Sequence, residues 1–443
     1  MLALHLNDLV AKASMSPAKL LIVDLDTGLL RTDLAREEFW RALGDGGWRT
    51  LLAGAPTSAD YLQKAEAADF PNLPMDGAVV EAMRAARAAG RRVALVTNSP
   101  EEQARRFADA LDFVDEAAGG APTGSARAAW LASRFGENDF EYVAASKPAR
   151  AGASKAYMKA LRPHQWVKNL LVFLPMIAAH RFDASTFAFT LIAFVAFCLV
   201  ASSVYLLNDM LDLAADRAHP RKRRRPMASG AVPLGHAGMM AVACLGAGFI
   251  LALFAGSAFV TALCGYMLLT TAYSLQLKRE PILDVCVLAA LYTLRIVAGA
   301  MATGITLSVW LLAFAIFIFL SLAAIKRQAE LVDNIQTGRE KVMGRGYTVA
   351  DLPIVEMMSV AAGYVAVLVL ALYVNAPTVV GLYGTPEALW AVCAVLLYWV
   401  SRAVMIAHRG EMHDDPIVFA MRDRVSHLCG VVIVAALAAA TWW

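Results

Sequence analysis

Long apolar stretches dominate the chain from about residue 169 onward, and short loops rich in lysine and arginine separate them. A helix crosses the hydrocarbon core of a bilayer when about 20 consecutive residues are mostly apolar. The pattern therefore predicts a bundle of nine transmembrane helices, eight of them clear and the ninth shorter. The stretches are Thr186–Leu207, Ala237–Ala255, Ala258–Ser274, Leu283–Ala302, Leu307–Ile325, Met357–Val374, Ala388–Ile406, Val425–Trp442 and, as the short ninth, Trp166–Ala179.

The N-terminal part follows a different pattern, in which short apolar runs end in polar residues. Three such runs, Leu20–Asp26, Arg92–Asn98 and Phe140–Ala145, are typical of buried parallel strands. Helical stretches lie between them, and strands that alternate with helices predict an α/β sheet. We therefore expect a soluble, Rossmann-like α/β domain at residues 1–150, followed by an all-α polytopic membrane bundle at residues 160–443.

The composition agrees with this division, because 59% of the residues are hydrophobic and only 17% are charged. Soluble globular domains are typically about 45–50% apolar and about 25% charged. The net charge of +3 is too small to indicate binding to nucleic acid. The six cysteines form no CxxC pair and lie in or beside apolar stretches, so we expect small buried hydrophobic side chains.

Basic residues are concentrated in four alternate loops of the predicted bundle, and the loops between these four hold a single one, Arg181. An excess of lysine and arginine marks the cytoplasmic loops of membrane proteins. The segment Met1–Leu21 lacks the basic start and compact apolar core of a signal peptide. We therefore expect a bacterial inner (plasma) membrane protein whose α/β domain is cytoplasmic and whose C-terminal end lies outside. The basic loops are residues 208–236, 275–282, 326–356 and 407–424.

Four polar residues directly follow the stretch Thr186–Leu207, namely Asn208, Asp209, Asp212 and Asp216. Asn208, Asp212 and Asp216 recur every four residues, so on a continuing helix they share one face, with Asp209 close to it. Like charges at this spacing repel, and a hard divalent cation removes the repulsion. Because Mg²⁺ commonly bridges protein carboxylates to phosphate oxygens, the spacing indicates a magnesium site. The alternative is a solvated helix end with ordinary acidic residues.

A basic run, residues 221–225, lies immediately downstream and ends at Arg225. Arginine binds phosphate in a bidentate manner, and basic runs beside membranes also contact anionic lipid headgroups. We expect some of these residues to bind substrate phosphate and others to contact only lipid.

These residues resemble the first aspartate-rich motif, NDxxDxxxD, of the UbiA superfamily of membrane transferases. Five further segments, in order along the chain, look like the decaprenyl-phosphate phosphoribosyltransferase branch of that superfamily. The resemblance implies Mg²⁺-dependent transfer of 5-phosphoribose from phosphoribosyl pyrophosphate to a polyprenyl phosphate, on the route to a cell-wall arabinan precursor. The segments are Arg162–Asn169, Asp216–Pro220 with Arg225 and Pro226, Tyr273–Lys278, Asp284 with Arg295, and Lys326–Glu330.

The resemblance also implies roles for individual residues. For Arg295, an ion pair with Asp284 is an equal alternative to substrate binding, and Tyr273 could equally be an interfacial aromatic anchor. The implied metal ligands are Asn208, Asp209, Asp212 and Asp216. The implied catalytic residues are Asp209, Asp212, Asp216, Lys168 and Glu330, and the implied substrate-binding residues are Asn208, Arg217, Arg225, Asn169, Tyr273, Lys278, Arg295, Lys326 and Arg327.

One departure distinguishes the branches of the superfamily. Aromatic-acceptor prenyltransferases usually carry a second aspartate-rich motif after the sixth span, where this chain has Lys326 and Arg327. Two phosphorylated substrates need more positive charge than one, which favours the phosphoribosyltransferase. The alternatives are an aromatic-acceptor prenyltransferase and a non-catalytic lipid-binding protein. Gly248 and Ala252, spaced i, i+4, suit close helix packing and leave a homo-oligomer open.

The N-terminal domain resembles the haloacid dehalogenase superfamily of phosphatases. On that resemblance Asp24 corresponds to the nucleophile, Asp26 to the general acid and Thr97 to the phosphate-binding hydroxyl. Arg127 stands where the family has a lysine, in the helix that precedes Gly136.

The resemblance is incomplete at the position of the last acidic motif. Residues 144–149 contain no carboxylate, and Lys147 lies there instead. A cation at that point disfavours magnesium, so we expect a catalytically inactive domain. An active phosphatase is the alternative, and it would need Asp115 or Glu116 to supply the missing acid.

Overall fold

The structure is a computed structural model that describes residues 20–44, 72–136, 140–144, 153–219, 221–340, 345–412 and 415–442. It divides into two compact units. The first unit comprises Met1–Arg162 and Tyr205–Ala243, and the second comprises Pro163–Val204 and Cys244–Trp443.

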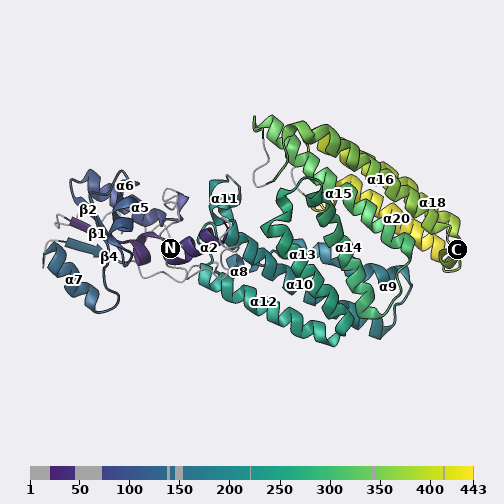
Figure 1. The fold of residues 1–443 in the computed structure, drawn as a ribbon, viewed down its shortest axis with the longest axis horizontal. Helices are drawn as coiled ribbons and strands as arrows, with labels where there is room; N and C mark the ends of the chain where they lie inside the picture. Colours follow the sequence, from purple (N-terminus) through teal and green to yellow (C-terminus); the bar gives the residue numbers. More distant parts are fainter. Residues whose placement is uncertain are drawn as a thin grey trace. The chain divides into compact units, whose positions relative to one another are not determined.

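A four-stranded parallel sheet forms the centre of the α/β part of the first unit (Figure 1). The strands are ordered β3-β2-β1-β4, and the three predicted strand positions are confirmed. Helices connect consecutive strands, as parallel pairing requires. The strands are β1 (Leu20–Asp24), β2 (Arg92–Val96), β3 (Glu116–Ala118) and β4 (Phe140–Val143), and the helices are the π-helix η1 (Leu25–Leu29), α2 (Leu34–Ala42), α5 (Gly77–Ala88), α6 (Glu101–Asp109) and α7 (Ala126–Phe135).

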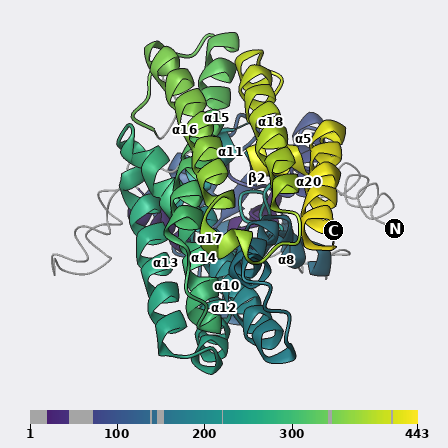
Figure 2. The same ribbon diagram turned by 90° about the vertical axis from the view of Figure 1, so that its right-hand side faces the viewer.

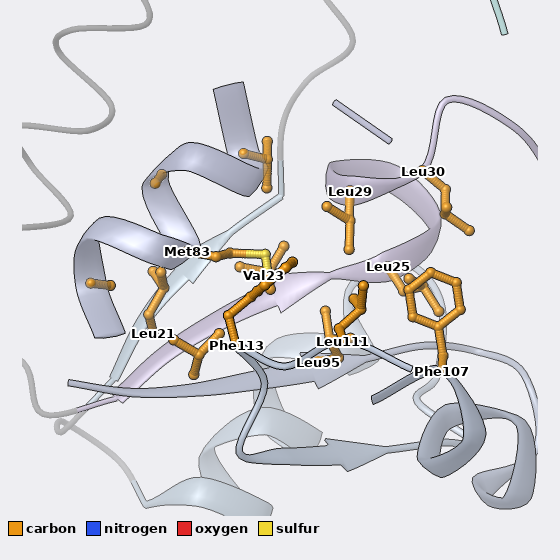
Figure 3. Close-up of a cluster of buried hydrophobic side chains, with 14 of the residues drawn as sticks. Leu21, Val23, Leu25, Leu29, Leu30, Met83, Leu95, Phe107, Leu111 and Phe113 are labelled. Carbon is orange, nitrogen blue, oxygen red and sulfur yellow. The ribbon is translucent and has the colours of Figure 1, made fainter. Parts of the chain in front are cut away.

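The sheet is buried on both faces, which explains why its strands are nearly continuous apolar runs. Leu21 and Val23 of β1 pack with Met83 of α5 and Phe107 of α6 in one hydrophobic cluster (Figure 3). Ile22, which points to the opposite face, belongs to a second cluster. Strands β1 and β2 are buried, whereas the outer strand β4 is partly buried and carries Glu141, which pairs with Arg91.

The remainder of the first unit surrounds the segment that carries the aspartate-rich motif. Its apolar residues form one cluster, in which Leu206, Met210 and Leu213 are buried and Trp40 of α2 is partly buried. The elements are α8 (Ala153–Ala160), the end of α10 (Ala184–Leu211), α11 (Leu213–Ala218), the 3-10 helix η5 (Lys222–Arg224) and the start of α12 (Leu234–Phe254).

Eight helices in the described part of the chain are long and apolar enough to cross a membrane. In the second unit α15, α16, α18 and α20 pack one beside the next (Figure 2). The eight are α10, α12, α13 (Ser257–Leu275), α14 (Leu283–Thr303), α15 (Val309–Gln336), α16 (Leu352–Val374), α18 (Trp390–His408) and α20 (Arg424–Trp442).

The short elements of the second unit connect these helices or lie beside them. They are the 3-10 helices η4 (Pro163–Phe173), η6 (Leu277–Arg279), η7 (Val349–Asp351) and η8 (Pro386–Leu389), and the short α-helices α9 (Leu174–Ala178), α17 (Pro377–Val380) and α19 (Pro416–Ala420).

The predicted count of nine spans is not confirmed, because Trp166–Ala179 does not form a long α-helix. It folds as η4 and α9, whose backbone is tolerated at membrane depth only where protein buries it. Its contacts follow α10 in the antiparallel direction: Trp166 donates to Ser202, Asn169 donates to Cys198, and Thr190 donates to Met176. The two polar residues of the segment, Lys168 and Asn169, are buried in protein.

Small residues allow close helix packing where the sequence indicated it. Gly248 of α12 lies directly against Ala196 and Val200 of α10, and Ala252 is fully buried. These contacts lie within one chain. Gly256, between α12 and α13, adopts a positive φ of 94°, which glycine tolerates without strain.

The cysteines follow the expectation only in part. Cys198, Cys393 and Cys429 are buried, but Cys286 on α14 is exposed, and all six are free thiols. An exposed thiol on an apolar helix costs little in a lipid environment, so burial is not required there.

Replacing Gly299 of α14 with alanine should lower the thermal stability. The added Cβ would overlap the carbonyl of Val172 in η4, and overpacking of this kind costs about 1–3 kcal/mol. Gly265→Ala on α13 is the matched control, because the space beside it is open and alanine is the better helix former. Thermal unfolding of the detergent-purified protein measures both variants. Equal melting temperatures would show that η4 does not pack tightly on α14.

Candidate functional site

The aspartate-rich motif lies at the end of α10 and on the short helix α11. The helix breaks at Asp212, but the N–H of Asp212 still donates to the carbonyl of Asn208 at 2.9 Å, and that of Asp216 to Asp212 at 2.8 Å. The i, i+4, i+8 register therefore continues through the break. Asp209 and Asp216 are buried, whereas Asn208 and Asp212 are half-buried.

Two arginines neutralise the buried carboxylates. Arg225 Nη1 lies 2.6 Å from Asp216 Oδ2 and 3.2 Å from Asp209 Oδ1, and Arg162 also pairs with Asp209 Oδ1. Burial raises the pKa of Asp216, and the Arg225 guanidinium opposes that shift. The second oxygen of Asp209, Oδ2, is buried and has no hydrogen-bond partner in the described part of the chain.

No group of three acidic, histidine or cysteine side chains in the described ranges is arranged to hold a metal ion. The motif thus offers two buried carboxylates, not a complete cage. Mg²⁺ is usually held by one or two carboxylates together with substrate phosphates, and such a site needs no third acidic ligand.

Arg217 was expected to bind substrate, but its donors are used within the protein. Nη1 and Nη2 bond to the two carboxylate oxygens of Glu37 on α2 at 2.7 and 2.6 Å, and Nε donates to the carbonyl of Ala228 at 3.1 Å. Glu37 was not expected from the sequence, because nothing in the local pattern of α2 links it to a residue 180 positions away.

The second unit contains a cluster of two lysines around one carboxylate. Lys168 Nζ lies 3.0 Å and Lys326 Nζ 3.1 Å from the same oxygen, Oδ2, of Asp415. Lys168 also lies 5.5 Å from the ring centroid of Tyr292. Burial alone would raise the pKa of Asp415, but the ammonium groups of Lys326 and Lys168 hold it below its usual range.

Asp415 was not expected from the sequence. Its only local signal is that it precedes Pro416 and caps α19 by accepting the N–H of Ile417 at 3.2 Å. That signal predicts a helix start and gives no indication of two distant lysines.

Asn169 and Arg295 meet in the interior of the second unit. Arg295 Nε donates to Asn169 Oδ1 at 2.9 Å, and Nη2 donates to the hydroxyl of Tyr266 at 3.1 Å. The alternative pairing of Arg295 with Asp284 is wrong. The two residues lie on the same helix, about 16 Å apart along its axis at 1.5 Å per residue.

Asp284 instead belongs to a separate polar cluster. Arg327 Nη2 lies 2.6 Å from Asp284 Oδ2, and Arg345 Nη1 lies 2.7 Å from Oδ1; the side chains of Asp284 and Arg327 are fully buried. Tyr273 also donates to Asp284 Oδ1 at 2.7 Å, so it has polar partners that a plain aromatic anchor would lack. Glu330 pairs with Arg327. Arg345 was missed because it lies in a loop with no periodic signal.

Lys278, the remaining residue expected to bind substrate, lies on the short 3-10 helix η6 and is half-buried. The other residues of the second unit that were expected to form the site fall into the three clusters just described.

In the α/β domain the four residues of the phosphatase-like site come together at the carboxyl ends of the strands. Asp24 Oδ2 accepts the hydroxyl of Tyr142 at 2.6 Å and lies 2.9 Å from Arg127 Nη2. Thr97 donates to Asp26 at 3.0 Å. Burial raises the pKa of Asp26, although hydrogen bonds from Asn98 and Thr97 lower it. Burial also raises the pKa of Tyr142, a residue that the sequence analysis missed.

The missing acid is not supplied by the two alternative residues. Asp115 Oδ2 accepts the N–H of Val93 at 2.8 Å, and Glu116 pairs with Arg92. Both lie at the amino end of β3: Glu116 is two residues and Asp115 three residues below the edge where Asp24 lies, because Val96 is in register with both Asp24 and Ala118. Lys147 and the rest of residues 145–149 lie outside the described residues.

Comparisons with known proteins extend this picture. A model of the UbiA prenyltransferase family matches residues 170–425. An uncharacterized protein of Sinorhizobium fredii, y4nM, is 30% identical over 464 aligned residues, covering 94% of this chain and 90% of the relative. Nodulation protein NoeC of Azorhizobium caulinodans is 40% identical, covering 62% of this chain and 89% of its own. Decaprenyl-phosphate phosphoribosyltransferase of Mycolicibacterium smegmatis is 34% identical, and the alignment covers 65% of this chain and 92% of the relative.

Replacing Asp415 with asparagine should lower the melting temperature markedly. The substitution leaves the ammonium groups of Lys168 and Lys326 close together without the carboxylate that they share. Breaking a buried ion pair in this way costs about 3–5 kcal/mol. Glu387→Gln, at an exposed position, is the control and should have no effect.

A comparison of wild type with Asp415→Asn also tests the pH dependence of stability. Because the pKa of Asp415 is lowered in the folded state, its contribution to stability is complete above the ordinary carboxyl pKa of about 3.9 and is lost only as the pH falls below it. The difference in melting temperature between wild type and Asp415→Asn should therefore be the same at about pH 7.5 and about pH 5.5. A difference that shrinks toward pH 5.5 would contradict the ion pairing.

Proposed function

Because this chain belongs to the UbiA prenyltransferase family, we propose that it transfers 5-phosphoribose from phosphoribosyl pyrophosphate to a polyprenyl phosphate. The chain is a multi-pass membrane protein of this transferase family. The finer assignment is supported by the similarity to the mycolicibacterial protein named decaprenyl-phosphate phosphoribosyltransferase. Both substrates carry phosphate groups, so the reaction needs cationic side chains that can bind phosphate oxygens.

The observation that carries the proposal is the pair of lysines that share one oxygen of Asp415. Two ammonium groups, 3.0 and 3.1 Å from a single anionic oxygen, have the arrangement that a phosphate oxygen also requires. Asp415 holds the ammonium groups of Lys168 and Lys326 in place before substrate arrives. A neutral aromatic acceptor would have no use for this concentration of positive charge.

Asp209 and Asp216 would hold Mg²⁺ together with the pyrophosphate of the donor, with Asn208 and Asp212 beside them. The buried oxygen Asp209 Oδ2, which has no hydrogen-bond partner among the described residues, is the best fit to a metal ligand. Bound Mg²⁺ would neutralise charge on the leaving pyrophosphate.

The side chains of the protein would do the remaining work. Arg162 and Arg225, which lie against the carboxylates, would contact pyrophosphate oxygens and orient the donor. An oxygen of the lipid phosphate then forms a bond to C1 of the ribose as the bond between C1 and the pyrophosphate oxygen breaks. Pyrophosphate leaves with the electron pair.

The membrane orientation is also part of the proposal. The loops rich in lysine and arginine, including residues 208–236 and 326–356, would face the cytoplasm of a bacterial inner membrane. Phosphoribosyl pyrophosphate is a soluble, highly charged donor, so a motif on the cytoplasmic side can reach it directly.

For the α/β domain we propose a phosphatase-like fold without phosphatase activity. Asp24, which resembles the nucleophile, already accepts two backbone N–H groups, the hydroxyl of Tyr142 and the charge of Arg127. These contacts occupy the carboxylate oxygens that would have to attack phosphate. Neither Asp115 nor Glu116 lies at that edge of the sheet.

Purified protein should convert labelled phosphoribosyl pyrophosphate, Mg²⁺ and a polyprenyl phosphate into a labelled lipid. Asp209→Asn and Asp216→Asn should each lower the rate by about 100-fold or more, since they remove electrostatic stabilisation of the leaving group. Asp112→Asn, an exposed position in the α/β domain, is the control and should retain full activity.

Two results would overturn this assignment. Prenylation of an aromatic acceptor without any labelled phosphoribosyl lipid would place the chain among the aromatic-acceptor prenyltransferases. Full complementation in cells by the two aspartate variants would favour a non-catalytic, lipid-binding role.

The full chain should release no phosphate from phosphorylated sugars in the presence of Mg²⁺. The reason is that Asp24 is held by Tyr142 and Arg127 and no second strand-end acid accompanies it among the described residues. A malachite-green assay of wild type and Asp24→Asn measures this directly. Phosphate release that disappears in Asp24→Asn would show that the domain is an active phosphatase.

A further inference from the structure

Helix α2 of the α/β domain packs directly on the aspartate-rich segment within the first unit. Trp40 of α2 contributes to the hydrophobic cluster that buries Met210 and Leu213. Just beyond the helix, a side chain at Gly44 would overlap the backbone carbonyl of Leu211. On the other side, the Arg36 guanidinium fills the space beside Gly235 at the start of α12. Contacts along the whole length of α2 therefore define its position.

A buried ion pair lies at the centre of this contact. Glu37 and Arg217 each expose only 6% of their side chains, and they form two parallel hydrogen bonds of 2.6 and 2.7 Å. Thr32 donates a further hydrogen bond to Glu37. A buried ion pair is tolerated only when its geometry is good and its remaining polar atoms are satisfied, and this pair meets both conditions.

Arg217 in turn connects two parts of the candidate site. It follows Asp216 directly on α11, and its Nε donates to the carbonyl of Ala228 at 3.1 Å. The segment between these two points carries Arg225, whose guanidinium bonds to Asp216 and Asp209. Fixing Arg217 therefore closes the segment 217–228 into a loop and holds Arg225 against the carboxylates.

We propose that Glu37 is a positioning residue for the transferase site, through which the α/β domain holds the aspartate-rich segment in its working conformation. The inference rests on the proposed function, because it assigns Asp216 and Arg225 to the pyrophosphate of the donor. Glu37 touches no substrate and acts through Arg217. The α/β domain is thus an integral part of the transferase, although it has no reaction of its own.

Kinetics of Glu37→Gln in the full chain test the proposal. The KM for phosphoribosyl pyrophosphate should rise about tenfold or more, the effect of losing one charge-assisted contact, while the KM for polyprenyl phosphate stays within about twofold. Glu102→Gln, an exposed glutamate on α6 that pairs with Arg106, is the matched control and should change neither value.

A double variant shows whether Glu37 acts through its partner. The KM for phosphoribosyl pyrophosphate of the double variant Glu37→Gln, Arg217→Gln should be no higher than that of the more impaired single variant, because coupled residues give non-additive effects. Additive losses, or an equal rise in both KM values, would overturn the proposal.

Hydrogen exchange of the purified full chain gives a readout that does not depend on activity. Amides in residues 213–228 should exchange faster in Glu37→Gln than in wild type. Their exchange rates in Glu102→Gln should equal those of wild type. Arg217→Lys, which keeps the charge but loses the bidentate geometry, is the second variant if Glu37→Gln fails to fold. If wild type transfers no phosphoribose, the proposed function fails while the exchange result still tests the positioning role. Unchanged hydrogen exchange at residues 213–228 in both Glu37→Gln and Arg217→Lys would overturn the positioning role of Glu37.

Discussion

A charge buried in an apolar interior is costly unless an opposite charge meets it, and this constraint underlies the arrangement of the polar residues in both units. Asp209 and Asp216 are met by arginines, Asp415 by two lysines, Asp284 by Arg327 and Arg345. The helices are apolar enough to enter a bilayer, so the few charges that they carry must find one another inside the protein. The pairs hold the interior of each unit together at the same positions where chemistry is expected.

Paired charges are also well suited to a substrate made of phosphates. A cation that already contacts a carboxylate oxygen has been removed from water and oriented, so a phosphate oxygen can take up the contact with little further reorganisation. The lysines around Asp415 and the arginines around Asp209 and Asp216 are both arranged in this way. On the proposed function, the same pairs would also hold their cations ready to bind a phosphate oxygen.

The α/β domain shows the same constraint with a different outcome. Asp24 lies at the end of β1 and Asp26 just beyond it, and both Tyr142 and Arg127 contact Asp24. A carboxylate with all of its oxygens engaged is a stable structural group and a poor nucleophile. Meanwhile helix α2 places Glu37 against Arg217.

The sequence by itself determined the elements that depend on near neighbours. The apolar stretches, the alternating strands and helices, and the register of Asn208, Asp212 and Asp216 all follow from periodicities of a few residues. The positions of Asp24, Asp26 and Thr97 at one sheet edge followed as well, since parallel strands end together. The place of Arg127 beside Asp24 was expected only from the family resemblance.

Only the tertiary structure decided which charges meet. Asp415 joins lysines 247 and 89 positions away, and Glu37 joins an arginine 180 positions away. Arg295 bonds to Asn169 and not to Asp284 on its own helix. The sequence did not predict that Trp166–Ala179 folds as a 3-10 helix and a short α-helix beside α10, because that conformation depends on burial by other helices. Pairing across such separations depends on how helices pack, and that information is spread over the whole chain without a local period.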